Sequence, residues 1–265
     1  MEDHAIRAEQ IPRTTAAEAA ELSFAELDKA LVLLRSLDEQ HWSRPTDCPG
    51  WTVTDMVAHM VGQYQGQARP LLGFARLRRA RRKYPDLTSL AASNQQQIDE
   101  LAHQSPADLT AAMDRAGRRG IRARGRIPRP LRSLRASRMY PEETLLDDRL
   151  DYVMDILSPR DAWMHRVDIA RATEQPLALD QVDKAIVAQV VRDLDRSWAV
   201  PCVLLELSGP AGGSWTIGHG TPVATIGVDA VDYMRTLAGR ADQPQLDANG
   251  SPAAFDAAVA ARVVF

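Results

Sequence analysis

The sequence predicts a mostly α-helical protein of the α+β class, with an N-terminal antiparallel four-helix bundle and a small C-terminal α+β domain. Apolar residues recur at helical spacing over much of residues 14–173, which is the pattern of helices that bury one face. Short β-branched runs separated by glycine turns appear only after residue 200, as expected for strands. We therefore expect a helical domain over residues 1–178 and an α+β domain over residues 179–265.

The first two helices are each expected to begin at a threonine cap. Leucines at helical spacing cover residues 14–37, where Thr15 and Glu18 have the pattern of a capping box. A second helix is expected to begin after the cap residue Thr52 and to continue to about Leu77.

Later segments complete the expected bundle. Residues 88–103 predict a third helix, and the Ser-Pro pair at Ser105 predicts the start of a short one. Another helix is expected to begin at Pro141, and helical spacing resumes from Pro159 to Thr173. Four main helices joined by short and long connections favour an antiparallel bundle.

An arginine run interrupts this helical pattern. Ten arginines and no acidic residue occur between Arg115 and Arg138, among glycines and prolines. A site for phosphate or nucleic acid is one interpretation. The run has no interleaved aromatic residues to stack on bases, however, and the whole chain has a net charge of −3. We therefore expect a solvated, mobile surface loop that could cover the mouth of the bundle.

The C-terminal domain is expected to combine short strands with three helices. The turn from Gly209 to Gly213 separates the first two strands, and Asp229 is the expected cap of the second helix. In chain order the expected elements are a helix over 182–198, strands over 203–207, 215–217 and 223–228, a helix over 229–237 and a terminal helix from Ser251.

Composition favours a cytoplasmic protein. Hydrophobic residues make up 45% and charged residues 25% of 265 residues, as in ordinary globular proteins. Two cysteines do not make a disulfide framework, and the N-terminus lacks the apolar core of a signal peptide. With no run of 18 apolar residues and a small net charge, we expect neither a membrane span nor a nucleic-acid partner. Composition leaves the oligomeric state open between a monomer and a homodimer.

Three polar residues near the end of the predicted bundle lie on one helix face. Asp161, His165 and Asp168 are at positions i, i+4 and i+7, which places them within about 60° of one another. A carboxylate and an imidazole one turn apart can reach a single ion. Asp161 and His165, together with His59 at the edge of the apolar face of the second helix, would make a site of two histidines and one carboxylate.

Each of these residues also has a purely structural interpretation. Asp161 could cap a helix, because Ser158 precedes it by three residues. His165 could be a core histidine bonded to a carbonyl, and His59 a residue of the helix surface. Asp168 could be a solvent-facing charge or a partner of Arg171.

Cys48 is a candidate nucleophile or fourth ligand. It lies in a Pro-Gly turn before the second helix, and lone cysteines are mostly small buried apolar residues. Nothing around it in the sequence indicates a lowered thiol pKa. The structural interpretation is therefore favoured.

Two segments resemble one protein family. The segment from Cys48 to His59, CPGWTVTDMVAH, resembles the N-terminal signature of the mycothiol-dependent maleylpyruvate isomerase family, which belongs to the DinB-like four-helix metalloproteins. The segment from Asp161 to Ile169, DAWMHRVDI, resembles the second metal segment of that family. The C-terminal GGSW motif and the stretch from Asp229 to Arg240 are similar to its smaller second domain.

The resemblance implies a divalent metal, zinc in most members, held by a histidine from the first segment and a carboxylate and a histidine from the second. Carried over to this chain, the ligands are His59, Asp161 and His165. The second-segment carboxylate is a glutamate in the founding isomerases. Asp161 is one methylene shorter, so the helix would sit closer to the ion or the ion would bind differently.

The resemblance also implies an activity. Mycothiol, a low-molecular-weight thiol, would bind the metal as a thiolate and attack a small electrophilic substrate, giving isomerisation or thiol transfer. Asp168 would orient His165 or take the thiol proton. The partners are then a small-molecule thiol and an electrophile. The alternative is a non-catalytic metal-binding, regulatory or ligand-binding module on the same fold.

Overall fold

The computed structural model describes residues 5–241 and 246–265. The chain divides into two compact units. Residues 15–177 form the helical unit, and residues 178–265, together with the segment that ends at Thr14, form the sheet unit. The predicted α+β class, mostly α, is confirmed.

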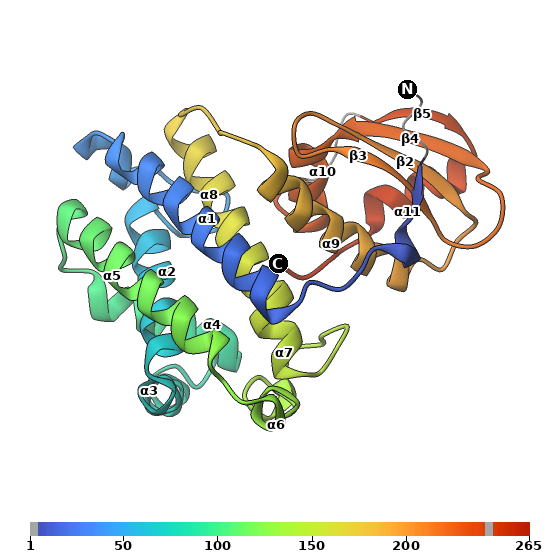
Figure 1. Ribbon diagram of the computed structural model, residues 1–265. Helices are drawn as coiled ribbons and strands as arrows, with labels where there is room; N and C mark the ends of the chain where they lie inside the picture. The colour runs from blue at the N-terminus through green and yellow to red at the C-terminus, as the bar shows by residue number, and fades with distance from the viewer. Residues whose placement is uncertain (1–4, 242–245) are drawn as a thin grey trace. The chain divides into compact units, whose positions relative to one another are not determined.

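Four helices form the centre of the helical unit: α1 (Ala16–Arg35), α2 (Val53–Ala68), α5 (Pro106–Gly125) and α8 (Ser158–Thr173). Both α1 and α2 contact α5 and α8, so the four surround one core (Figure 1). This core is made of buried aliphatic and methionine side chains, which include Leu27, Leu31, Val57, Met60, Val61, Leu109, Met113 and Ile169.

The predicted caps of the first two helices are confirmed. Thr15 and Glu18 bond reciprocally at the start of α1, and Thr52 and Asp55 do the same at the start of α2. Each capping box satisfies backbone N–H groups that the first helical turn leaves without partners. The cap of α2 thereby fixes where the helix that carries His59 begins.

The second predicted helix is shorter than expected. It ends at Ala68, and α3 (Pro70–Lys83) follows. Proline restricts the residue before it to extended conformations, and Arg69 has φ −138° and ψ 79°. The expected continuous helix to Leu77 is therefore wrong. Two helices, α3 and α4 (Ser89–Leu101), pack against each other and against α2.

The expectation of a mobile arginine-rich loop is also wrong. Residues 106–125 form α5, so half of the run lies on a main helix of the bundle. The glycines of the run allow close packing: a Cβ at Gly117 would lie 2.7 Å from the Leu27 side chain, and one at Gly120 would lie 2.6 Å from the Tyr64 carbonyl oxygen. The run continues through α6 (Arg129–Arg132) and a 3-10 turn at Ala136–Arg138.

The helix expected from Pro141 begins later, at Leu150. Residues 141–149 are not helical. The Asp148 carboxylate in this segment accepts hydrogen bonds from the Ser137 backbone N–H (2.6 Å) and hydroxyl (2.7 Å). Helical structure then runs through α7 (Leu150–Tyr152) and a π-helical turn at Val153–Leu157 into α8.

The sheet unit contains a five-stranded mixed sheet in the order β1-β3-β2-β4-β5. The strands are β1 (Ile6–Arg7), β2 (Val203–Ser208), β3 (Gly213–Ile217), β4 (Ala224–Asp229) and β5 (Asp247–Gly250). Three helices accompany them, α9 (Gln181–Ser197), α10 (Ala230–Leu237) and α11 (Pro252–Ala260).

The pairing of β1 explains why the leading segment groups with the sheet. Ile6 and Arg7 lie parallel to Trp215 and Thr216 of β3, and the Gln189 side chain of α9 donates a hydrogen bond to the Pro12 carbonyl (2.9 Å). A two-residue strand is too short to give a period-2 signal, so the sequence predicts this segment as part of the helical domain over residues 1–178.

Among the helices that the structure describes, none is long and apolar enough to cross a membrane.

The close approach of α5 to α2 predicts different effects for two glycines of α5. Gly120→Ala should lower the free energy of unfolding by about 1–3 kcal/mol, because the new methyl group meets the Tyr64 backbone. Gly125→Ala is the control, since no atom lies within 4 Å of its Cβ position. Urea unfolding of both variants measures the difference, and equal stability would contradict the packing described.

Candidate metal centre

The structure brings the three predicted ligands together. His59 comes from α2, and Asp161 and His165 come from adjacent turns of α8. One ligand atom from each residue lies within 4.8 Å of the other two. The packing of α2 against α8 closes the gap of about a hundred residues between them.

His59 is held in one orientation by α4. Its Nδ1 lies 2.8 Å from Oε1 of Gln97, whose amide nitrogen donates to the Ser93 hydroxyl at 3.5 Å. With the amide oriented this way, Oε1 accepts a hydrogen bond from Nδ1–H of His59. The lone pair on Nε2 of His59 is then left for an ion. His59 is 3% exposed, so its interpretation as a surface residue is wrong.

Asp161 faces the site and does not cap a helix. The helix continues into α8 from the π-helical turn, and the Ser158 hydroxyl donates to the Val153 carbonyl. The two carboxylate oxygens of Asp161 lie 3.0 Å from Nε2 of Gln63 and 3.2 Å from Nε2 of His165. The capping interpretation is therefore wrong.

His165 lies between two carboxylates. Its Nε2 lies 3.2 Å from Asp161, and its Nδ1 lies 3.6 Å from Oδ2 of Asp168. Both ring nitrogens are buried, and neither makes a hydrogen bond of normal geometry with the residues that the structure describes. Buried polar atoms are nearly always bonded. The Nε2 atom of His165 is thus suited to bind an ion.

The two histidines differ in charge. Burial, and then the charge of His165, lowers the pKa of His59 to about 4. Burial also acts to lower the pKa of His165, but Asp161 and Asp168 raise it well above its usual value. Burial acts to raise the pKa of Asp161, yet the charge of His165 keeps it below its usual range. The site therefore combines an Asp161–His165 ion pair with a neutral His59.

Asp168 is fully buried beside the site. Its Oδ2 lies 3.8 Å from Sγ of Cys48, and these two residues with His165 form a second group of potential ligand atoms. Arg171 instead approaches Asp47, at 3.7 Å. The interpretation of Asp168 as a solvent-facing charge is therefore wrong. Its position beside Nδ1 suits a residue that orients His165.

Trp51 forms one side of the candidate centre. Its ring centroid lies 5.1 Å from that of His59 and 6.2 Å from that of His165, and the two imidazoles meet edge to face at 5.1 Å. An aromatic ring in this position limits the access of water to both histidines.

The donor set fits a divalent cation with open coordination positions. Two imidazole nitrogens and one carboxylate oxygen are ligands typical of zinc, and three protein ligands are typical of catalytic rather than structural zinc sites. The shorter Asp161 side chain reaches the same point as the two imidazoles.

Three contributing residues were not identified from the sequence. Gln63 follows His59 by four residues, and this spacing could have identified it as a neighbour on the same helix face. Trp51 belongs to the CPGW part of the first motif, which by itself assigns it no role. Gln97 is separated from His59 by 38 residues, and no local spacing pattern connects the two.

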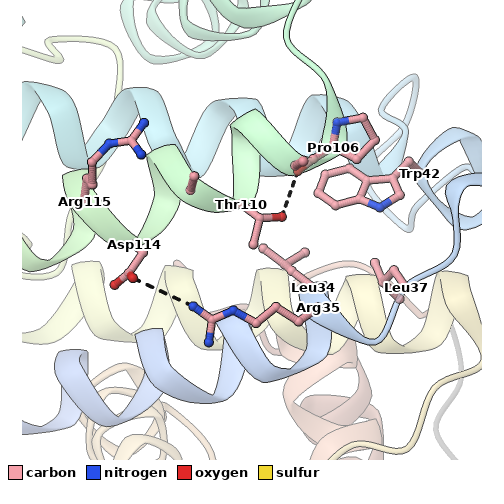
Figure 2. A pocket seen from close by; sticks show the side chains of 10 residues that line it. Leu34, Arg35, Leu37, Trp42, Pro106, Thr110, Asp114 and Arg115 are labelled. Carbon is pink, nitrogen blue, oxygen red and sulfur yellow. Dashed lines mark hydrogen bonds and ion pairs between the residues drawn. The ribbon is translucent and has the colours of Figure 1, made fainter.

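A hollow between α1 and α5 has no part in this centre. Its volume is about 570 Å³, and its lining includes Leu34, Trp42 and Thr110. In Figure 2, Arg35 faces Asp114 across this hollow at 3.8 Å. None of the candidate ligands lines it, so we do not connect it with metal chemistry.

Comparisons with known proteins show which proteins this chain resembles. Two uncharacterized proteins of Mycobacterium tuberculosis, from strains CDC 1551 and H37Rv, are each 25% identical over 243 residues, which are 85% of this chain and 86% of the relative.

Two crystal structures share the fold. The mycothiol-dependent maleylpyruvate isomerase has a TM-score of 0.55 at 14% identity, and a histidine-to-alanine mutant of it has 0.56 at 15%. Each comparison covers 91% of this chain and 95% of the other. The family model described as the mycothiol maleylpyruvate isomerase N-terminal domain matches residues 23–170. The chain therefore belongs to the mycothiol maleylpyruvate isomerase N-terminal domain family.

Proposed function

We propose that the chain is a mycothiol-dependent metalloenzyme, an isomerase or S-transferase that acts on a small electrophilic substrate. The observation that carries the proposal is that His59, Asp161 and His165, from two helices, bring ligand atoms within 4.8 Å of one another, with both histidines buried. Family membership supports mycothiol as the thiol.

The three ligands would hold the ion, and a divalent cation such as Zn²⁺ bound there would lower the pKa of a coordinated thiol. The protein's own contribution is positioning. Gln97 directs Nε2 of His59 to the ion site, and Asp168 lies against Nδ1 of His165. Gln63 holds one oxygen of Asp161 through a hydrogen bond.

The sulfur of mycothiol would be the nucleophile, so no protein nucleophile is needed. Its addition to a carbon–carbon double bond, followed by rotation and expulsion of the same thiolate, isomerises the substrate. If the new carbon–sulfur bond is kept, the adjacent carbanion takes up the proton that the thiol lost, and the product is a thioether. Trp51 restricts water at the histidines, which favours the thiol as the nucleophile over water.

Removal of a histidine ligand should remove the metal. Protein purified without a histidine tag should contain about one divalent ion per chain, and His59→Ala or His165→Ala should abolish it. His103→Ala, which replaces an exposed histidine outside the site, is the control and should keep the ion. Elemental analysis by mass spectrometry measures the content.

Two results would contradict the site or the activity. Wild-type protein without stoichiometric metal, or mutants that retain it, would exclude the three ligands. Metal-loaded protein without turnover of mycothiol and a panel of electrophiles would instead support a non-catalytic binding module on the same fold.

The Gln97 contact predicts a difference between two glycines of α2. A Cβ at Gly62 would lie 2.6 Å from the Cβ and Cγ atoms of Gln97, whereas one at Gly66 would meet its nearest atom at 3.8 Å. Gly62→Ala should therefore displace Gln97 from His59 and weaken metal binding by about tenfold or more. Gly66→Ala should bind metal as the wild type does. Competition with a chromophoric chelator measures both, and equal affinities would contradict a positioning role for Gln97.

Metal affinity should rise with pH. His165 must lose its proton to bind an ion, and its pKa is raised well above the usual value. Below that pKa the affinity should increase by up to about tenfold per pH unit, because one proton is released. His59, with a pKa of about 4, is already neutral near pH 6, so metal binding should release no second proton from it. The chelator competition repeated from about pH 6 to 7.5 gives the slope. A flat profile would contradict the ion pair described.

A further inference from the structure

A second cavity of the helical unit lies next to the candidate metal centre. Its volume is about 410 Å³, within the range of small-molecule sites. Gln63 and Gln97 both line it, and each makes a hydrogen bond to a candidate ligand, Asp161 or His59. The cavity therefore ends one side chain away from the ligands.

The walls of this cavity are largely apolar. The aliphatic, aromatic and methionine side chains that line it come from α3, α4 and the segment between α5 and α8, and include Phe74, Leu77, Leu90, Ile127, Leu131, Leu134, Met139, Tyr140, Leu150, Val153 and Met154. Phe74, Leu90, Leu131 and Leu134 are each between 38% and 52% exposed. Because these exposed side chains also line the cavity, its mouth is apolar and open to solvent.

One buried cation lines this apolar space. Arg124 is 4% exposed, and it forms no ion pair with any residue in the described ranges. Its guanidinium donates to the Ser23 hydroxyl. Asp155, a buried carboxylate nearby, is paired with Arg132. The other arginine of the cavity, Arg76, pairs with Glu100 at 2.8 Å.

A buried charge without a counterion is costly, and guanidinium binds carboxylate through two parallel hydrogen bonds. We propose that this cavity binds an apolar monocarboxylate, with its carboxylate on Arg124 and its apolar part against the α3 and α4 side chains. Burial lowers the pKa of Arg124, and a bound carboxylate would offset that penalty. The further claim that such a carboxylate is the substrate of the metal centre rests on the proposed function. Binding of the carboxylate in the cavity does not.

Isothermal titration calorimetry on the full chain tests the proposal, by measuring the affinity of the protein for straight-chain carboxylates. From hexanoate to octanoate to decanoate, affinity should rise about fourfold per added methylene, because each is buried against apolar walls. Octanoate should bind about tenfold or more tighter than 1-octanol, which lacks the charge. Succinate should not bind detectably. Equal binding of octanoate and 1-octanol, or preference for succinate, would overturn the inference.

Variants locate the binding. Arg124→Gln should reduce octanoate affinity to that of 1-octanol and leave 1-octanol unchanged. Leu131→Asp, at the mouth of the cavity, should weaken octanoate binding by about tenfold or more. This variant tests the proposal if Arg124→Gln does not fold. Its control is Leu71→Asp, which introduces the same charge at a residue that is 86% exposed and outside the lining. Octanoate binding that survives both cavity variants would overturn the proposal.

The same titration in His59→Ala separates this inference from the proposed function. The affinity for octanoate should be the same in this variant, in metal-depleted wild-type protein and in untreated wild-type protein. Such binding to a protein that never holds metal would uphold the cavity while the proposed function fails. Metal-dependent turnover of mycothiol without octanoate binding would overturn only the cavity.

Discussion

The helical unit has to hold polar side chains, His59 and His165 among them, inside an apolar bundle. His59 and His165 are almost completely buried where α2 meets α8, and burying unpaired polar groups costs free energy. The structure meets part of this cost with neighbouring side chains. Gln97 bonds His59, and Gln63 bonds Asp161. The ring nitrogens of His165 lie near Asp161 and Asp168 but make no hydrogen bond of normal geometry within the described residues, so an ion would compensate there.

The same constraint explains how the surrounding helices are built. The ligands keep their positions only if α2 and α8 cannot slide, and the capping box at Thr52 together with the aliphatic core below it fixes α2. The α4 helix then has to approach closely enough for Gln97 to reach His59. Gly62 permits this approach, because a methyl group there would overlap the Gln97 side chain. A small residue in α2 is thus connected to the orientation of a ligand.

In the arginine-rich segment, some of the charges that the sequence predicts to be solvated are buried. In sequence, ten arginines without an acidic residue have the composition of a solvated loop. In the structure, glycines bring α5 against α1 and α2, so Arg124 of α5 lies in the interior. Arg132, at the end of α6, is buried as well. Arg132 has a carboxylate partner and Arg124 has a hydroxyl. Arg124 is therefore the arginine that, under the inference above, would bind an anionic ligand in the cavity beside the candidate metal centre.

The sequence alone determined the features that depend on neighbours within one or two helical turns. These were the threonine caps of α1 and α2, the apolar stripes and the shared face of Asp161 and His165, because helical hydrogen bonds and side-chain contacts repeat every three to four residues. Family resemblance added His59 to that pair. Only the tertiary structure decided that Gln97 orients His59, that Asp161 is not a cap and that Arg124 is buried. The Gln97 contact and the burial of Arg124 depend on packing between helices separated by tens of residues, for which local spacing carries no signal. Asp161 is not a cap for a local reason, because helical structure already runs through Val153–Leu157 into α8.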